Sequence, residues 1–386
     1  MPTDTKFPRI AIVDIPGKGK GVIAKEFIPR GTLIISERPR ITLPANASGI
    51  IDIQGIFGIL EALSALSEED AEFFQSFPCA PYEDPILGRL KHFTPCVGDD
   101  AFGLCLTICR TNHTCCSPKE SPNASYVWNR SAKEEELRAI KEIHEGQEIE
   151  VSYTSEITTY EPHPAYLRRK FGFECFCKGC TRPAVERHIS DQRILAYNAF
   201  VPRLHSRFGQ ENPLQILKDI ETQILIVCEE GFTFEIAGRA DDAFELCALH
   251  GDAASARQWE EICRDRYAMY FGPNSEHFKT AQRLAARPQD YRAWQMLGRR
   301  NLKGPSKQVL EYCYRKVETV PALPTEPSIS AVVSKPVASQ DTAIASGSNL
   351  HSASAPPKLS KSQKKKARAK AKKQAEESSS KTIVAM

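Results

Sequence analysis

The feature that most constrains this sequence is a group of three cysteines, Cys175, Cys177 and Cys180, with the spacing C-x-C-x-x-C. This spacing lets three thiolates converge on one metal ion, and a structural zinc ion requires four ligands in a tetrahedron. The fourth ligand must then come from another part of the chain, so the fold has to bring two distant segments together. Spacing alone leaves four candidates open: Cys79, Cys96, Cys115 and Cys116. The alternatives to zinc are a redox pair or incidental cysteines.

The rest of the sequence favours a reducing compartment. The first seven residues lack the apolar core of a signal peptide, and there is no apolar run of about 18 residues, the length of a membrane-spanning helix. Hydrophobic residues make up 41% of the chain and charged residues 26%, as in soluble proteins. We therefore expect the nucleus, the cytoplasm or both, with no membrane partner. The 13 cysteines are then expected to bind metal or stay free rather than form a disulfide framework.

The first half of the chain alternates short apolar runs with turns. Strands are predicted near residues 9–13, 21–24, 32–36, 104–108, 125–128 and 148–152, and helices within 56–77. Strands and helices do not alternate regularly, which argues against a Rossmann-type sheet. The sequence instead predicts an α+β fold whose first part is a small, irregular, β-rich domain.

The second half has a different pattern. Residues 184–316 are predicted to be helical, with clear helical periodicity at 214–226 and 240–249, whereas residues 320–386 are rich in Pro, Ser, Ala and Lys and are expected to be disordered. The predicted organisation is a β-rich domain with its cysteine motif at 1–183, carrying a helical insert at about 50–100, then an all-α domain at 184–316 and a low-complexity tail at 317–386.

The charge is concentrated in that tail. Residues 358–386 contain ten Lys or Arg and two Glu, a net charge of +8, so the remaining 357 residues carry −5 of the overall +3. A solvated basic tract is the simplest interpretation. The functional alternatives are nuclear import and weak contact with nucleic acid or acidic chromatin surfaces.

Three further motifs are ambiguous when taken singly. The Gly-rich segment Gly17–Gly21 precedes a strand instead of a helix, so NAD binding is not indicated, and a plain β-turn is the alternative. Asn112 and His113 could hold a ligand or be structural. Tyr153 ends a predicted strand, where a tyrosine commonly packs as an amphipathic side chain.

The order of the four motifs is more specific than any one of them. A Gly-rich turn, then R-x-N-H-x-C, then G-x-E-I-x-V-S-Y, then F-x-C-x-C-x-x-C resembles the SET-domain protein-lysine methyltransferases that carry a post-SET zinc motif. The form Phe-Glu-Cys-x-Cys-x-x-Cys is similar to the SMYD-type branch and to related fungal SET proteins. The resemblance covers roughly residues 8–182, and it implies S-adenosylmethionine as methyl donor, a structural zinc ion, and a protein lysine as acceptor, with histones as a candidate substrate.

The resemblance also implies roles for individual residues. Tyr153 matches the active-site tyrosine, Asn112 and His113 match the pair that holds the adenosine, and Phe173 matches the aromatic side chain that stacks on adenine. The main chain around Lys18, Gly19 and Lys20 would contact the methionine part of the cofactor, and Tyr153 borders the same site. The implied zinc ligands are Cys115, Cys175, Cys177 and Cys180.

The sequence departs from the family pattern at several points. Thr114 stands where the family usually has Ser, and the inserted residues 116–121 make Cys116 a rival of Cys115 as a zinc ligand. The Cys/His-rich MYND module of the SMYD branch is absent, because residues 46–100 contain only Cys79 and Cys96. A third cofactor-binding Asn upstream of Asn112 is not evident, and His92 lies roughly in its place.

The chemistry of these residue types fits methyl transfer. A free lysine has a pKa of ~10.4 and must lose its proton before its amine can attack a sulfonium methyl group. A narrow apolar channel lowers that pKa, and positioning supplies most of the rate gain. Two rivals remain. One is a SET-fold adaptor with little or no activity, and the other is a zinc-dependent hydrolase, which the absence of H-E-x-x-H disfavours.

Overall fold

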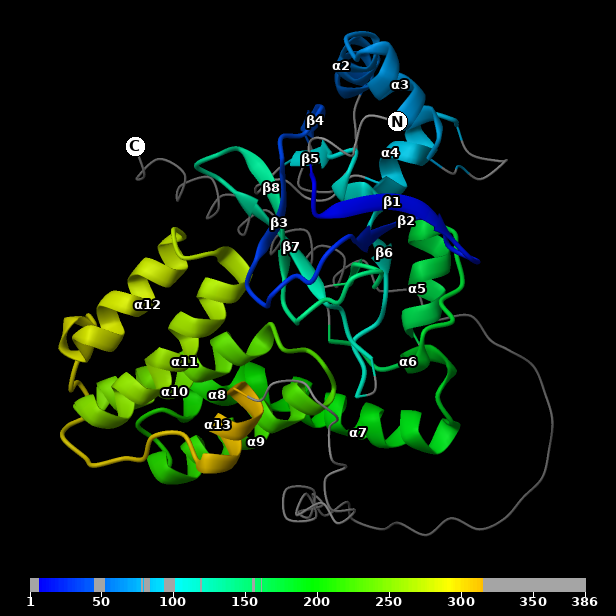
Figure 1. Ribbon diagram of the computed structural model, residues 1–386. Helices are drawn as coiled ribbons and strands as arrows, with labels where there is room; N and C mark the ends of the chain where they lie inside the picture. Colours follow the sequence, from blue (N-terminus) through cyan, green and yellow to red (C-terminus); the bar gives the residue numbers. More distant parts are fainter. Residues whose placement is uncertain are drawn as a thin grey trace, which may run out of the picture. The chain divides into compact units, whose positions relative to one another are not determined.

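A computed structural model describes residues 7–44, 53–77, 79, 84–93, 101–118, 120–154, 157–160 and 162–314 (Figure 1). These residues fall within one compact unit, Met1–Val320. None of the helices in these ranges is long and apolar enough to cross a membrane. The predicted tail at 317–386, Cys96 and the side chain of His92 lie outside the described residues.

The first part of the chain is built from short strands, as the sequence predicts. Their bounds are β1 Ile10–Ile15, β2 Gly19–Ala24, β3 Leu33–Glu37, β4 Ile41–Pro44, β5 Ala101–Leu104, β6 Asn112–His113, β7 Ala124–Asn129, β8 Glu134–Ala139 and β9 Glu150–Val151. Antiparallel pairing joins β1 to β2, β4 to β5, and β8 to both β3 and β7. The exception is β6, which pairs parallel to β9.

One apolar core lies beneath these strands. It contains Ile10, Val22, Ile35, Leu137 and Val151, each 2% exposed or less, together with neighbours from the same strands. Because alternate residues of a strand face opposite sides, only two or three apolar side chains of each short strand pack into this core. The isolated bridges Ile23–Glu148 and Ile28–Ile143 tie the β1–β2 hairpin to the segment that leads into β9.

A second apolar cluster lies under the helical insert. The insert contains α2 Ile53–Ser64, α3 Glu68–Gln75 and α4 Leu87–Phe93. Ser67 precedes helix α3 and caps it, because its side chain accepts a hydrogen bond from the Asp70 main-chain N–H. Phe74, Phe77 and Leu90 pack with Leu104 and Leu106 in this cluster.

The strand predicted at 104–108 is wrong beyond Leu104. Strand β5 ends there, and a 3-10 turn, η1 Ile108–Arg110, follows. The cause is the buried Glu37 carboxylate, which accepts hydrogen bonds from the main-chain N–H groups of Thr107 and Ile108 at 3.0 Å each. A carboxylate that takes these donors holds the chain in a turn, and it leaves them unavailable to a strand ladder.

The second half is helical, coloured green to yellow in Figure 1. Its elements are α5 Pro162–Phe171, α6 Lys178–Thr181, α7 Ala184–Phe200, η2 Val201–Arg203, α8 Leu204–Arg207, α9 Pro213–Glu229, α10 Glu235–Leu249, α11 Ala253–Phe271, α12 Glu276–Ala286, η3 Pro288–Asp290 and α13 Lys307–Tyr314. Helices α9 to α12 share a core with Ile220, Phe244 and Trp259 at its centre, each 1% exposed or less. Asn212, Asp252 and Ser275 cap α9, α11 and α12 by accepting main-chain hydrogen bonds.

Helix α11 also contacts strands β7 and β8. Gly272 follows its last residue and caps the helix, with a φ of +80° that suits a residue without a side chain. A Cβ atom there would come within 2.5 Å of Nη2 of Arg138 on β8. Arg138 is held by a salt bridge to Glu136, 2.7 Å from nitrogen to oxygen, with both side chains about nine-tenths buried.

Candidate active site and metal centre

The parallel pair β6–β9 is the centre of the candidate site. Asn112 lies opposite Glu150, and His113 lies opposite Val151. The side chain of Asn123 stabilises the pair, because its amide nitrogen donates to the Glu148 carbonyl at 2.8 Å and its oxygen accepts from the Glu150 N–H at 2.9 Å. The Asn-His motif is therefore held beside the strand that runs into Tyr153.

His113 and Tyr153 are joined directly. The main-chain N–H of Tyr153 donates to Nδ1 of His113 at 2.9 Å, so a neutral imidazole carries its proton on Nε2. Burial lowers the pKa of His113 to about 3, with the nearby His163 acting in the same direction. The ring is therefore neutral near pH 7, with its Nε2–H available as a donor.

The phenol of Tyr153 is also neutral. Its hydroxyl donates to the Thr111 carbonyl oxygen at 2.7 Å, and burial raises its pKa. The ring stands among other aromatic rings, with centroid distances of 4.9 Å to Phe171, 5.1 Å to His113 and 6.2 Å to Phe173. The Phe173 ring is also 6.0 Å from that of His113, so it lies close to both His113 and Tyr153.

The Gly-rich segment forms the β1–β2 turn. Gly17 and Gly19 have φ values of +75° and +76°, and a Cβ atom at either would meet no atom within 4 Å. The main chain here is therefore open to the approach of a ligand. Gly21 is different, because a Cβ atom there would lie 2.7 Å from Nδ2 of Asn112. The same amide nitrogen lies 3.3 Å from the Lys20 carbonyl oxygen, so the turn and the Asn-His motif are neighbours.

The side chains of the two lysines in this turn are held by carboxylates. Nζ of Lys18 donates to Glu148 at 2.8 Å and to Glu150 at 2.6 Å, and Lys20 pairs with Asp14 at 2.9 Å. Burial lowers the pKa of Lys18, but the hydrogen bonds that it donates to the two glutamates, and their charges, raise it by more, so the ammonium stays charged. This pairing leaves the main chain of the turn as the part that faces a ligand.

The four predicted cysteines meet in one cluster. The sulfurs of Cys115, Cys175, Cys177 and Cys180 all lie within 4.8 Å of one another, and none forms a disulfide. The Cys115 sulfur is 3.8 Å from that of Cys175 and 3.4 Å from that of Cys180. Tetrahedral zinc with Zn–S bonds of about 2.3 Å places its sulfurs roughly 3.8 Å apart, so the four thiols fit such an ion.

Cys116, the rival candidate, lies elsewhere. It packs against the core of the helical half, and burial raises its pKa to about 12. Among the described cysteines, it is Cys115 that the fold brings to Cys175, Cys177 and Cys180. Cys79 is not part of this group, and Cys96 is outside the described residues.

His163 and Phe171, both on helix α5, are not among the site residues predicted from the sequence. Nε2 of His163 lies 3.0 Å from the Cys115 sulfur, and Nε2 of His113 lies 3.2 Å from it, so two imidazoles contact one thiol. Phe171 covers the Tyr153 ring. Neither residue lies within the four motifs, and only the Phe-Gly-Phe sequence at 171–173 could have suggested that two aromatic residues act together.

Comparison with known proteins agrees with this geometry. A model of the SET domain matches residues 19–154, from the Gly-rich turn to the residue after Tyr153. A histone-lysine N-methyltransferase of Schizosaccharomyces pombe, set5, is 30% identical over 288 residues, which is 72% of this chain and 84% of that protein. The Arabidopsis thaliana histone-lysine N-methyltransferase ATXR4 is 32% identical over 69 residues, 18% of this chain and 19% of its own length.

The chain belongs to the SET-domain family of protein-lysine methyltransferases. The match to set5 extends well beyond the SET domain, because 288 aligned residues are about twice the length of 19–154. Methyl transfer in this SET enzyme uses S-adenosylmethionine, the general cofactor of the family, which supplies an electrophilic methyl group on a sulfonium.

The remaining chemistry depends on this chain's own side chains. A neutral Tyr153 that donates to the Thr111 carbonyl keeps the lone pairs of its oxygen available to accept a hydrogen bond from an incoming amine. The rings of Phe171 and Phe173 lie beside that phenol, and apolar surroundings of this kind would favour the uncharged form of an amine. The site is thus suited to orienting a lysine instead of acting as a strong base.

Proposed function

We propose that this SET enzyme methylates lysine side chains of histones and acts in the nucleus. The observation that carries the proposal is the 30% identity to a histone-lysine N-methyltransferase of which this chain covers 84%. The alignment covers 84% of set5 and so includes residues outside the SET domain. Surfaces formed by such residues can contribute to the selection of a protein substrate.

Within the site, we propose Tyr153 as the residue that orients the lysine amine. The cofactor would be held by the main chain at Lys18, Gly19 and Lys20, by Asn112 and His113, by Tyr153 itself, and by Phe173 against the adenine. The proposal is supported by the open main chain at Gly19, by the contact of Asn112 with the Lys20 carbonyl, and by the ring distances among His113, Tyr153 and Phe173.

We further propose that Cys115, Cys175, Cys177 and Cys180 bind one structural zinc ion. Their sulfur spacing supports this. The ion would fix helix α5 and residues 171–180 against β6, and so hold Phe171 and Phe173 next to Tyr153. His113 and His163, both within 3.2 Å of the Cys115 sulfur, would orient that ligand by hydrogen bonds, as is common around metal sites.

The domain organisation we propose is a SET domain with its zinc motif at 1–183, a helical domain at 184–316 and a basic tail at 317–386. The net charge of +8 over 358–386 suits weak contact with nucleic acid or the acidic surface of chromatin. Such contact would raise the local concentration of the enzyme near histones without selecting a sequence.

The experiment is a comparison of lysine methylation in cells with and without the gene, measured by mass spectrometry of whole-cell and histone peptides. The proposal expects at least one histone lysine to lose methylation when the gene is deleted and to regain it with the wild-type gene but not with the Tyr153→Phe gene. If methylation is lost only from proteins other than histones, the histone proposal is wrong. Isothermal calorimetry with S-adenosylmethionine separates the enzyme from an inactive adaptor, which would bind no cofactor.

A further inference from the structure

Three potential metal ligands meet between helices α10 and α11, in the helical half of the chain. A carboxylate oxygen of Asp241, a carboxylate oxygen of Glu260 and the Cys263 sulfur all lie within 4.8 Å of one another. Glu260 and Cys263 are three residues apart on α11, the spacing that places two side chains on one face of a helix. Asp241 comes from the neighbouring helix α10. These residues are distinct from the cysteine cluster of the SET domain.

Two of the three groups are fully buried. Glu260 is 2% exposed and Cys263 is 0% exposed, whereas Asp241 is at the surface. The Oε2 oxygen of Glu260 is buried and has no hydrogen-bond partner among the described residues. The Cys263 thiol donates to the Ala237 carbonyl oxygen at 3.4 Å, and it also interacts with the Glu260 carboxyl group, whose Oε2 remains without a partner. A buried, unsatisfied carboxylate oxygen is costly, and a bound cation is one way to satisfy it.

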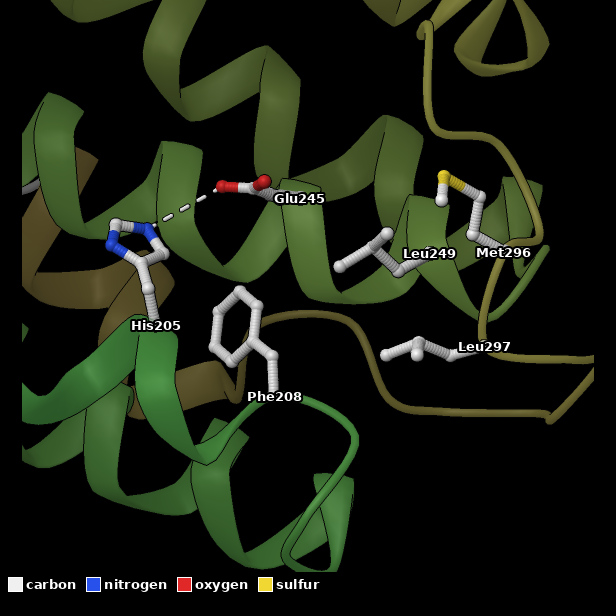
Figure 2. Close-up of a pocket in the computed structure, with 6 residues that line it drawn as sticks. All are labelled: His205, Phe208, Glu245, Leu249, Met296 and Leu297. Atoms are coloured by element: carbon white, nitrogen blue, oxygen red, sulfur yellow. Dashed lines mark ion pairs between the residues drawn. The ribbon is translucent and has the colours of Figure 1, made fainter.

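Among the described residues, no basic side chain forms an ion pair with the cluster, although the charges of Arg239 and His205 act on Asp241. Arg239 and His205 lie nearby, but both are paired with Asp242, at 3.1 and 3.0 Å. Figure 2 shows His205 directed towards Glu245 across a pocket lined by Phe208, Leu249, Met296 and Leu297, and that pair is 3.4 Å apart. No ion pair joins Asp241 or Glu260 to a basic residue in the part of the chain that the structure describes.

The ionised forms of the two buried groups are disfavoured. Burial raises the pKa of Glu260 to about 8, with the charge of Asp241 acting in the same direction and the interaction with Cys263 acting against it. Burial raises the pKa of the Cys263 thiol, and the charges of Glu260 and Asp241 add to the rise. A divalent cation bound among them would reverse both effects, because metal ligation favours the deprotonated forms.

We propose that Asp241, Glu260 and Cys263 bind one zinc ion that joins helix α10 to helix α11. The thiolate favours zinc over magnesium or calcium, which prefer ligand sets made only of oxygen. Three protein ligands leave the fourth tetrahedral position to water, and the surface position of Asp241 provides an entrance for the ion. The ion would stabilise the contact between the two helices, and the site is independent of the histone proposal.

The test is a count of zinc in the purified full-length chain. The protein is loaded with zinc sulfate, separated from loosely bound ion by gel filtration, and analysed by mass spectrometry of the metal. Asp241→Asn and Glu260→Gln are each expected to lower the zinc content by one ion per chain. Glu261→Gln changes the neighbouring carboxylate on the same helix, which is outside the cluster, and is expected to lower nothing. Cys177→Ser tests the cysteine cluster separately, so the result for one zinc site does not decide the result for the other.

A second readout covers the risk that a buried substitution disturbs folding. Asp241 is at the surface, so Asp241→Asn should fold normally, and added zinc should raise its Tm by less than it raises the Tm of the wild type. Equal zinc content and an equal Tm shift in the wild type and in Asp241→Asn would overturn the proposal. Glu260 would then be a protonated buried acid that binds no metal.

Discussion

The main-chain N–H of Tyr153 donates a hydrogen bond to Nδ1 of His113 at 2.9 Å. Nε2 of the same ring lies 3.2 Å from the sulfur of Cys115. A single imidazole therefore connects the tyrosine of the candidate active site with the cysteine cluster. The position of Tyr153 therefore depends on whether the cysteine cluster is well ordered. The residue that links them is His113, which the resemblance matches to the pair that holds the adenosine.

Replacing that imidazole should disturb both sites together. In His113→Phe the ring volume is kept, but the Tyr153 N–H loses its acceptor and Cys115 loses a donor. We expect kcat/KM for methyl transfer to fall roughly 10–100-fold, the usual cost of removing a residue that orients a metal ligand, together with weaker zinc retention against a chelator. The exposed His188→Gln on α7 is the matched control. If His113→Phe lost activity but retained zinc as well as the wild type does, the proposed link between Tyr153 and the cysteine cluster would be wrong.

The two neighbouring cysteines should behave differently. Cys115→Ser removes a sulfur from the cluster, whereas Cys116→Ser changes a side chain that packs against the helical core. Metal analysis should find one zinc ion fewer in Cys115→Ser and no change in Cys116→Ser. The reverse result would mean that the inserted residues 116–121 place Cys116 at the metal.

The junction of α11 with β8 can be tested with two glycines. Gly272→Ala places a Cβ against the buried Arg138 guanidinium and forces an unfavourable positive φ, so it should destabilise the protein by roughly 1–3 kcal/mol. Gly238→Ala, inside α10 with no atom within 4 Å of the new Cβ, should stabilise it by roughly 0.5–1 kcal/mol. Urea denaturation measures both. If both substitutions changed the free energy of unfolding in the same direction, the contact with Arg138 would not be what restricts position 272 to glycine.

Glu135 on β8 should make the protein less stable as the pH rises. Burial, with the neighbouring charge of Glu136, raises its pKa to about 8, whereas an exposed glutamate in the unfolded chain has a pKa of about 4.3. Between these values the unfolded state releases a proton that the folded state keeps, so the cost to folding is absent below about pH 4 and complete above about pH 8.

Glu135→Gln should remove that dependence. We expect its free energy of unfolding to match that of the wild type near pH 4.5 and to exceed it at pH 8 by an amount on the order of a few kcal/mol. The exposed Glu145→Gln serves as the control. Denaturation at both pH values is the measurement, and a Glu135→Gln difference that does not grow with pH would show that Glu135 is ionised in the folded protein.

The sequence predicts several of the strands, but it misses the short strands β4 and β6 and the charged strand β8. Strand β8 begins with three glutamates, Glu134 to Glu136, and its sequence has no apolar alternation. The structure buries Glu135 and Glu136 and pairs Glu136 with Arg138, an arrangement that depends on α11 and on no local pattern. The strand predicted at 104–108 ends early because of Glu37, about 70 residues away along the chain.

The sequence predicts those candidate site residues that lie within short motifs. These residues are Asn112, His113, Tyr153 and the three cysteines at 175–180. His163 is not predicted, because its contact with Cys115 arises only when helix α5 packs beside β6, and nothing in its own neighbourhood in the sequence marks it. The choice between Cys115 and Cys116 likewise depends on which way each side chain points, which adjacent residues in a sequence do not reveal.

The most direct test of the account is methyl transfer from labelled S-adenosylmethionine to purified histones by the wild-type protein and by Tyr153→Phe. The substitution removes only the hydroxyl that donates to the Thr111 carbonyl. Tyr291→Phe, which removes a hydroxyl bound to Glu245 in the helical half, is the control. The account predicts labelled histone lysine with the wild type and with Tyr291→Phe, and transfer reduced at least about 100-fold in Tyr153→Phe with cofactor binding retained. Equal transfer by Tyr153→Phe and the wild type would contradict it.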